Sequence, residues 1–542
     1  MNKMLKILGL MLGAAILWSS CDDLMDTDSQ RLTAEEEFRL ATPSDSVYSI
    51  FGLFTQLQKI ADSYVLLGEL RGDLLETTPA SDRELLEIYR HSVSKNNKFA
   101  DVRNYYSIIN NCNYMLTYLD TAKVDRGELL SRKHYAAVHA IRAWTYMQLA
   151  LNFKTAKYYS KPILTVNDAG KTYPELDIEA LADSLIPLLE PLRTVPIPNI
   201  GYIEAYNTSF SFFPVQFVLG DLYLWKGEYQ KAAEQYRDLM YTRSIAINKD
   251  HSSTWLPVNN TISSNATLFW IRSLMMSSNE VITTIACPTE YGQDFALDSL
   301  NNQKKIQPTQ LALRNWDIPV YYLNEASNTN GDLRKFGSIS YSNETRRQAV
   351  SDYAFANHPS PDYVIYKYKV YQQNITIYRS SLLYLRYAEA LNRMNKPNAA
   401  FAVLKYGLNS SNLFNNKIVP AAERGNPVPD YLNLADMRFQ NNVGIRMRGL
   451  GNMDKDTTFY RIPRQATLID SVKVVEDMIQ QELALETAFE GNRFHDLMRF
   501  TLRRMKEGDD ASYLADKVSA KYPNKTEMRL YLMNPDNWYI KK

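Results

Sequence analysis

Cys21 is the residue whose surroundings point most directly to a chemistry, because it ends an apolar run in the stretch ILWSSCDDLMD. Two cations, Lys3 and Lys6, precede twelve uncharged residues, 7–18. A membrane-spanning helix needs about 20 such residues, so this run is too short for a stable span. A basic start, a short apolar stretch and small residues before the break are typical of a cleaved secretory signal. In bacteria a cysteine at this place is acylated on its thiol, so we expect Cys21 to become a lipid-bearing N-terminus.

Both the type of signal peptide and the cellular location of the protein have an alternative interpretation. Trp18 stands where lipoprotein signals usually have leucine, so an ordinary signal peptide with an incidental cysteine is the other interpretation. Four aspartates follow the cysteine closely: Asp22, Asp23, Asp26 and Asp28. They resemble the export tag of surface lipoproteins in some Gram-negative bacteria, whereas a plain linker would serve only as a spacer. We expect a signal over 1–20, an acidic tether over 21–42, and a lipid-anchored protein of the outer membrane that faces the cell exterior.

No catalytic or metal-binding motif is recognisable elsewhere. The sequence has six histidines: His91, His134, His139, His251, His358 and His495. None has the HExxH spacing, and His134 and His139 are five apart, which places them poorly on one helix face. Carboxylate pairs for glycoside hydrolysis cannot be identified in a sequence, because their separation in space decides their role. We expect no catalytic residue, no metal and no cofactor, and a surface hydrolase is the alternative.

The amino-acid composition limits which classes of function the protein is expected to have. The formal net charge is +1, so nothing in the overall charge favours nucleic acid as a partner. Besides Cys21, the cysteines are Cys112 and Cys287, and we expect two buried thiols rather than a disulfide. The chain has 37 tyrosines and 7 tryptophans. A tyrosine has a flat apolar face and a polar tip, which suits sugar-binding surfaces and helix cores equally.

The clearest internal repeat is the segment VQFVLGDLYLWKGEYQKAAEQYRDLM, residues 215–240. It fits the tetratricopeptide pattern of two packed helices joined by a turn. Gly220 and Ala232 are small residues where the helices would touch, and Gly227 marks the turn. A second copy of the pattern occupies residues 382–408.

The second copy has Ala388 and Ala400 at the small positions and Asn395 at the turn. A third candidate helix, AIRAWTYMQLALNF, would have its partner delayed to residues 178–193, with Pro187 and Pro191 bending it. The copies lie far apart in sequence, so we expect no continuous solenoid.

Long loop-rich segments separate these copies. Residues 250–380 and 409–470 have clusters of Pro, Gly, Asn and Ser between short Tyr, Ile and Val runs. Loops of this length in a folded protein are usually functional or mobile. Helical patterns also cover residues 44–67 and 478–500, and the second of these helices would join the repeat stack. The predicted fold is therefore mostly α, a tetratricopeptide-like helical scaffold with long loop-rich insertions.

The most specific motif is IQQELALETAFEGNRFHDLMRF, residues 479–500. It resembles the C-terminal signature of the SusD/RagB family of nutrient-binding lipoproteins, in which Glu-x-Ala-Phe-Glu-Gly precedes Arg, an aromatic residue and Asp-Leu. The matching residues are Glu486, Ala488, Phe489, Glu490, Gly491, Arg493, Phe494, Asp496 and Leu497. We expect these residues to be structural: Arg493 and the glutamates Glu482, Glu486 and Glu490 as charge pairs, and Phe494 as a packing residue.

The resemblance covers essentially the mature chain, because the early loop, the helix pairs and the lipoprotein start occur in the family's order. It implies a single SusD-like domain over 43–542, with an N-terminal part over about 43–245 and a C-terminal part over about 246–542. It also implies a binding protein and not an enzyme. Such a protein captures an oligosaccharide, or in some cases a peptide, and passes it to a SusC-like TonB-dependent barrel. A repeat scaffold for protein assembly is a further alternative.

The resemblance places ligand contacts in the early loop after the first helix and in the middle insertion. The early part of the chain offers Arg71, Asp73, Asn96 and Asn97. The middle insertion offers Trp316, Tyr321 and Tyr322, with Trp255 as a second choice. Aromatic faces suit sugar rings, and the polar groups would fix orientation. The competing interpretation is that each aromatic packs under a loop and that Arg71 pairs with Glu69 or Asp73 as a brace.

Overall fold

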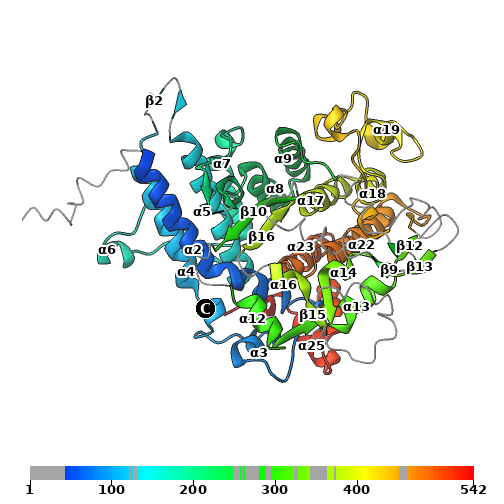
Figure 1. Ribbon diagram of the computed structural model, residues 1–542, viewed down its shortest axis with the longest axis horizontal. Coiled ribbons are helices and arrows are strands. Elements are labelled where there is room, and N and C mark those ends of the chain that lie inside the picture. Colours follow the sequence, from blue (N-terminus) through cyan, green and yellow to red (C-terminus); the bar gives the residue numbers. More distant parts are fainter. Residues whose placement is uncertain are drawn as a thin grey trace, which may run out of the picture.

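The structure is a computed structural model of the chain (Figure 1). It describes residues 43–121, 124–125, 128–129, 131–204, 206–247, 257–258, 261–262, 280–287, 295–322, 328–341, 363–370, 374–450 and 460–541. The expected signal, the acidic tether and Cys21 lie outside these residues, as does Trp255.

The first described helix, α2 (Pro43–Glu69), confirms the helix predicted over 44–67. Proline at a first helical position has no amide hydrogen to lose and a fitting φ angle. The buried residues of α2 recur at helical spacing and turn one face to the core: Ile50, Leu53, Leu57, Ile60 and Ala61. The other face of α2 does not point to this core.

Helix α5 (Arg132–Phe153) lies inside the protein, because every residue from Ala136 to Phe153 is buried. A helix buried on all sides must be covered by neighbours on all sides. The neighbours include α4 (Val102–Tyr118), α7 (Ile178–Leu189) and α8 (Val215–Lys226). The predicted pairing of the third repeat is thus confirmed, with Pro187 inside the delayed partner helix α7.

The two clear repeats also form the predicted helix pairs. They are α8 with α9 (Tyr229–Thr242), and α17 (Ser380–Arg393) with α18 (Pro397–Lys405). Gly227 and Asn395 occupy equivalent turns and both have positive φ, 85° and 59°. Glycine and asparagine are the residues that adopt this left-handed conformation most readily.

The repeats are continuous in space although they are separate in sequence. Helix α9 packs against α17, so the helices follow one another in the order α5, α7, α8, α9, α17, α18. This row runs across the upper part of Figure 1. The repeats are thus interrupted in sequence, as expected, and contacts between α9 and α17 join them into one row of helices in space.

The helix predicted over 478–500 is two helices, α22 (Leu468–Glu486) and α23 (Arg493–Lys506). The segment between them turns at Phe489 and Gly491, whose φ angles are 70° and 95°. The carboxylate of Glu69 accepts hydrogen bonds from the amides of Phe489 at 3.1 Å and Gly491 at 2.8 Å. These bonds from a distant helix replace the intrahelical bonds that a continuous helix would form, so the break has a tertiary cause.

Glutamates of the C-terminal motif bind buried cations from the middle of the chain. The Nη1 of Arg334 lies 2.8 Å from Glu482 and 3.2 Å from Glu486. Nη1 of Arg379 lies 2.8 Å from Glu486, and its Nε lies 2.7 Å from Glu490. The predicted role of these glutamates as charge pairs is confirmed, and they attach the middle insertion to α22.

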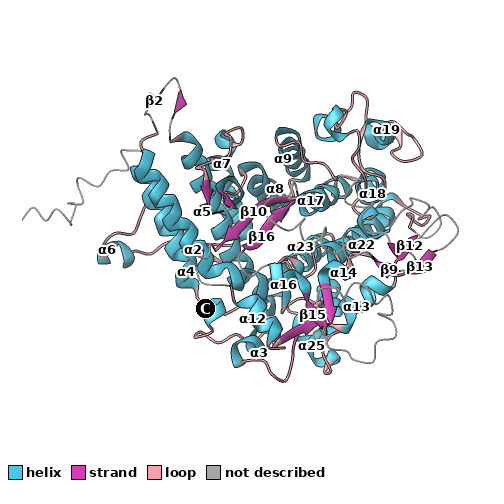
Figure 2. Ribbon diagram, in the orientation of Figure 1, coloured by secondary structure: helices cyan, strands magenta, loops and turns pink. Residues whose placement is uncertain are grey.

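Strands are short and form two-stranded antiparallel ladders in the described residues (Figure 2). The longest ladder pairs β10 (Val281–Ala286) with β16 (Asn374–Arg379). The other ladders pair β1 (Leu75–Thr77) with β11 (Ile306–Pro308), β2 (Val124–Asp125) with β3 (Glu128–Leu129), β4 (Ala156–Lys157) with β5 (Glu175–Leu176), β6 (Tyr202–Ile203) with β7 (Tyr206–Asn207), β8 (Pro257–Val258) with β9 (Thr261–Ile262), β12 (Val320–Tyr322) with β13 (Asn328–Asn330), and β14 (Ile339–Tyr341) with β15 (Tyr363–Ile365).

Shorter helices complete the fold. They are α3 (Arg83–Tyr89), α6 (Val166–Ala169), α12 (Ala296–Asn302), α13 (Gln310–Asp317), α14 (Lys335–Ser338), α16 (Tyr366–Val370), α19 (Ser410–Leu413), α20 (Ala421–Arg424), α21 (Met447–Leu450), α24 (Ser512–Ser519) and α25 (Lys525–Leu532). The 3-10 helices are η1 (Lys98–Ala100), η2 (Glu190–Leu192), η3 (Thr208–Ser211), η5 (Asp430–Leu432), η6 (Met437–Phe439) and η7 (Pro535–Trp538). The mostly α fold predicted from the sequence is confirmed.

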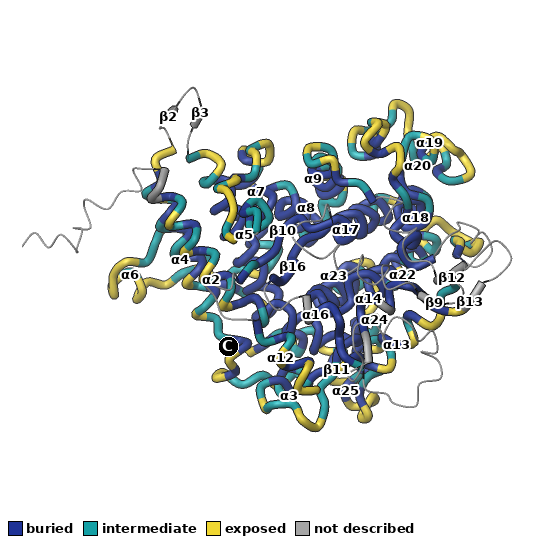
Figure 3. Tube along the Cα trace, viewed as in Figure 1, coloured by how far each residue is buried: buried dark blue, intermediate teal, exposed yellow. Residues whose placement is uncertain are grey.

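The core runs through the repeat helices and the C-terminal pair α22 and α23, which are the darkest parts of Figure 3. Cys112 and Cys287 are both buried and are not joined in a disulfide, as predicted. Burial raises the pKa of the Cys112 thiol to about 12. The thiol therefore stays protonated and unreactive at neutral pH.

Candidate functional site

Arg71 follows α2 and is only 1% exposed. Its Nε donates to the carbonyl of Leu67 at 2.8 Å, and its Nη1 donates to the carbonyl of Trp538 at 2.9 Å. Its Nη2 donates to Oδ1 of Asn152 and lies 3.2 Å from Nε2 of His495. The guanidinium therefore joins the start of the domain to its end.

Asp73 pairs with Arg493 and not with Arg71. Nε of Arg493 lies 2.6 Å from Oδ1 of Asp73, and Nη2 lies 2.8 Å from Oδ2. Asn97 is also buried, and its Oδ1 caps η1 by accepting from the amide of Phe99 at 3.1 Å. The structure does not support direct ligand contact by Asp73 or Asn97, because their polar atoms are already bonded inside the protein.

Trp316 lies in α13 and is 1% exposed, so it is a core residue and not an exposed platform for a sugar ring. Its indole Nε1 donates to the carbonyl of Leu485 at 3.2 Å, and its ring lies 5.9 Å from that of Phe489. The expectation of a ligand anchor here does not agree with the structure. The alternative of an aromatic packed beneath a loop does agree, and the packing partner is the end of α22.

The other predicted contacts stay predictions. Asn96 is exposed in the loop between α3 and η1. Tyr321 and Tyr322 lie in β12, opposite β13. Trp255 is outside the described residues.

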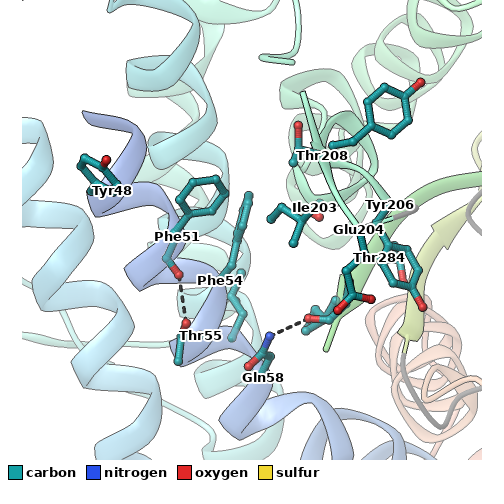
Figure 4. A pocket seen from close by; sticks show the side chains of 15 residues that line it. Tyr48, Phe51, Phe54, Thr55, Gln58, Ile203, Glu204, Tyr206, Thr208 and Thr284 are labelled. Carbon is teal, nitrogen blue, oxygen red and sulfur yellow. Dashed lines mark hydrogen bonds between the residues drawn. The ribbon is translucent and has the colours of Figure 1, made fainter. Parts of the chain in front are cut away.

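A pocket that includes none of the predicted ligand-binding residues lies between α2, the β6–β7 hairpin and β10 (Figure 4). Its volume is about 620 Å³. Small-molecule sites are usually concave and span roughly 300–1,000 Å³. The described residues that line it are Tyr48, Phe51, Phe54, Thr55, Leu57, Gln58, Tyr202, Ile203, Glu204, Tyr206, Thr208, Ser211, Thr284, Ile285 and Ala286.

One wall of this pocket is the second face of α2. Tyr48, Phe51, Phe54 and Gln58 recur at intervals of three and four residues, so they lie along one side of the helix. Tyr48 is 73% exposed and stands at the outer end of the wall. Phe54 packs edge-on against Phe212 with ring centroids 5.1 Å apart, which holds its ring in place.

The facing wall is the hairpin formed by β6 and β7. Tyr202 is 70% exposed, so the pocket has exposed aromatic rings on both sides of its opening. Glu204 forms the hairpin turn with a φ of 52° and is the charged residue among the described lining residues. Burial raises the pKa of Tyr206, so its phenol is neutral at physiological pH and is able to donate a hydrogen bond.

Several polar side chains of the lining are bonded within the protein. Nε2 of Gln58 donates to the carbonyl of Ala286 at 2.7 Å, which ties α2 to β10. The hydroxyls of Thr55, Thr208 and Thr284 donate to backbone carbonyls at 3.1, 2.8 and 3.0 Å. The pocket therefore presents mainly aromatic and aliphatic surface, which suits the apolar face of a sugar ring or another flat ligand group.

The sequence contained one signal for this pocket. A surface helix needs a single apolar stripe to face the core, and α2 has that stripe in Ile50, Leu53 and Leu57. The extra aromatic residues Tyr48 and Phe51 lie off the stripe, which marks a second apolar face. The opposite wall comes from a hairpin about 150 residues later, and nothing local in the sequence connects the two.

The described residues contain no cluster of three His, Cys, Asp or Glu side chains arranged to hold a metal ion. No helix in the described part of the chain is long and apolar enough to cross a membrane.

Comparison with known proteins gives a family match at the C-terminal end and a fold match over nearly the whole chain. Residues 440–539 match the model of the SusD family. A search of curated proteins by sequence finds no match.

Three solved structures illustrate the fold match. A SusD superfamily protein from Bacteroides vulgatus is 14% identical, with a TM-score of 0.59 and coverage of 91% of this chain and 93% of the other. A SusD-like carbohydrate binding protein from Bacteroides fragilis is 15% identical, with a TM-score of 0.55 and coverage of 85% and 86%. A laminarin binding SusD-like protein is 15% identical, with a TM-score of 0.52 and coverage of 86% and 94%. The C-terminal region of this chain thus matches the SusD family, and the fold of nearly the whole chain is that of SusD superfamily structures.

Proposed function

We propose that this protein is a cell-surface nutrient-binding lipoprotein that captures an oligosaccharide and passes it to a SusC-like TonB-dependent outer-membrane transporter. The observation that carries the ligand-binding part is the aromatic pocket between α2 and the β6–β7 hairpin. Exposed Tyr48 and Tyr202 at its opening offer flat faces on which sugar rings stack. Helices α4 and α5, which pack against α2, would hold the α2 side of the pocket in a fixed position.

The relatives support a carbohydrate as the ligand. One similar structure is of a carbohydrate binding protein and another is of a laminarin binding protein. Peptide is the alternative ligand, because the pocket has few polar groups available to read sugar hydroxyls. We propose that the protein binds its ligand without cleaving it, and a surface hydrolase is the alternative that an activity measurement would reveal.

The proposed location at the cell surface rests on Cys21 and on the acidic residues after it. A lipid tether would keep the protein close to its transporter, which raises the effective concentration of the pair without a tight interface. Replacing Cys21 by Ala should release the protein from membranes or leave its signal uncleaved. Normal processing with unchanged membrane retention would disprove the anchor. Protease added to intact cells should degrade the wild-type protein if it faces the exterior.

The binding proposal is tested by titrating the purified protein with plant, host and microbial oligosaccharides and with short peptides. For any ligand found, Phe51→Ala should weaken binding by more than about 1 kcal/mol, which is roughly fivefold. Phe414→Ala is the matched control, because Phe414 is a partly exposed aromatic residue outside the pocket lining. Equal affinity in the wild type and in Phe51→Ala would place the ligand elsewhere. Release of shorter sugars during the titration would favour the hydrolase.

The transporter partner is tested separately. Co-purification in mild detergent should recover a TonB-dependent barrel with the lipidated protein. Uptake of the ligand should fail when the gene for that barrel is deleted. Intact uptake without the barrel would contradict delivery to such a transporter.

A further inference from the structure

A second, smaller cavity lies between the segments that follow α2 and α3 and the C-terminal end of the chain. Its volume is about 220 Å³, so it has room for one small group and not for a chain. The described lining residues are Arg71, His91, Ser92, Val93, Tyr531, Asn537, Trp538, Tyr539, Ile540 and Lys541. None of these residues belongs to the lining of the aromatic pocket.

The charges in this lining are of one sign. Arg71 and Lys541 are cations, and the described lining residues include no aspartate or glutamate. The aromatic pocket has the opposite arrangement, with Glu204 as its charged residue. The two cavities therefore differ in the ligand chemistry that they suit.

Arg71 differs from the other fully buried arginines in its partners. Arg334, Arg379, Arg448 and Arg499 each form an ion pair with a carboxylate at 2.6 to 2.9 Å. The hydrogen bonds of Arg71 within the described structure go to two carbonyls, an amide oxygen and an imidazole nitrogen. Its Cζ also lies 4.5 Å from the centroid of the Phe494 ring, which is a favourable but weak contact for a cation.

A buried cation without a counter-ion is costly, because no nearby negative charge compensates for its lost hydration. The effect is visible at Arg71, where burial lowers the pKa of the guanidinium to about 9. The four hydrogen bonds occupy four of the five N–H groups that a guanidinium has. An anion in the cavity would supply the missing charge and an acceptor for the remaining N–H on Nη1.

His91 adds a buried imidazole to the same cavity. Both of its ring nitrogens are buried and lack a well-formed hydrogen bond among the described residues, and the backbone of Arg71 is the acceptor that interacts with the ring. The ring is held 5.5 Å from the ring of Phe494, and Tyr531 donates its hydroxyl to the backbone carbonyl of His91 at 3.2 Å. Burial and the neighbouring charge of Arg71 lower the pKa of His91, so its imidazole is neutral and has one N–H to donate.

We propose that this cavity binds a carboxylate group of a ligand, held by the charge of Arg71 and by hydrogen bonds from His91 and Lys541. A planar carboxylate suits a guanidinium, and a cavity of 220 Å³ accepts it together with the small unit that bears it. Two sources have this chemistry: the uronic acid of an acidic oligosaccharide and the C-terminal carboxylate of a peptide. The proposal goes beyond the proposed function, since it stands on a different cavity.

The test is calorimetric titration of the purified full chain with glucuronate, with glucose, with an acetylated dipeptide that has a free carboxylate, and with the amide of that dipeptide. Experiments are run at constant ionic strength. We expect binding of at least one carboxylate probe, with binding of its neutral counterpart at least tenfold weaker. Glucuronate alone indicates the sugar acid, and the dipeptide acid alone indicates the peptide. Binding of neither acid, or equal binding of the acid and neutral forms, would overturn the proposal.

Substitutions of the residues that line this cavity test whether the carboxylate binds here. Lys541→Gln and His91→Asn should each weaken carboxylate binding at least threefold, and asparagine tolerates the positive φ of 54° at position 91. Lys525→Gln, an exposed change in α25, is the matched control and should have no effect. Arg71→Met removes the charge and should abolish binding if the protein folds; the other two variants decide the matter if it does not. Unchanged binding in both Lys541→Gln and His91→Asn would overturn the proposal.

Carboxylate binding in this cavity can be measured independently of ligand binding in the aromatic pocket. Lys541→Gln should leave oligosaccharide binding at Phe51 unchanged when the oligosaccharide is neutral. Phe51→Ala should leave the affinity for glucuronate or the dipeptide unchanged. Failure of one proposal therefore leaves the other measurable.

Discussion

Arg493 and Asp73 form a two-pronged buried ion pair between positions 420 residues apart, with contacts of 2.6 and 2.8 Å. The pair joins the segment after α2 to the first turn of α23. Gly72 lies against the same arginine, where an added Cβ would come within 3.1 Å of its Cγ. The early stretch Arg71–Asp73 and the C-terminal motif are thus two halves of one structural contact.

Removal of one partner of this pair should be severely destabilising. Asp73→Ala leaves the Arg493 guanidinium buried without its charge partner, and such changes cost about 3–5 kcal/mol. The free energy of unfolding, measured by urea denaturation, should fall by that amount. The double variant Asp73→Leu/Arg493→Met should recover part of the loss because no charge is left buried. A loss below about 1 kcal/mol in Asp73→Ala would contradict a buried pair.

Glu486 should make stability depend on acid pH. Burial alone would raise the pKa of its carboxyl, but Arg379, Arg448 and Arg334 lower it to about 2. Since the folded-state pKa lies below the unfolded value, the stabilisation is complete above pH 4.5 or so and is lost as pH falls toward about 2. The amount is about 3 kcal/mol. The free energy of unfolding of the wild type, measured between pH 6 and pH 2, should show this loss. The Glu486→Gln variant should be less stable than the wild type at pH 6, and its stability should change less with pH across this range.

Gly220 should tolerate no side chain. An added Cβ would lie 2.3 Å from Cε1 of Tyr236, and Tyr236 is fixed by a hydrogen bond to Asp221 at 2.8 Å. Gly220→Ala should therefore destabilise the α8–α9 pair by about 1–3 kcal/mol. Gly52→Ala is the matched control in α2, because nothing lies within 4 Å of its added Cβ. That change should be neutral or stabilising by up to about 1 kcal/mol, since alanine is the better helix former.

Trp316→Ala should lower stability and not ligand binding. The change empties a core position at the end of α22, and large aromatic truncations cost about 3–5 kcal/mol. The melting temperature should fall, while the variant that stays folded at low temperature should bind ligand as the wild type does. Weakened binding at an unchanged melting temperature would restore Trp316 as a ligand contact.

The local sequence was sufficient to predict helix α2 and the helix pairs of the repeats. Gly227 and Asn395 mark equivalent turns by residue type alone, because few residues adopt positive φ readily. The spacing of apolar residues in α2 and the small residues Gly220 and Ala232 identified helix faces and helix contacts. Periodicity and turn chemistry act within a few residues, so a sequence displays them directly.

The tertiary structure decided everything that depends on a partner far away in the chain. Trp316 is indistinguishable in sequence from an exposed aromatic, and only the packing of α13 on α22 buries it. The break after Glu486 arises because Glu69 binds the amides of Phe489 and Gly491 in place of a helical turn. The aromatic pocket combines α2 with a hairpin about 150 residues later. Burial and charge pairing are properties of which segments meet, and the sequence by itself does not state which segments meet.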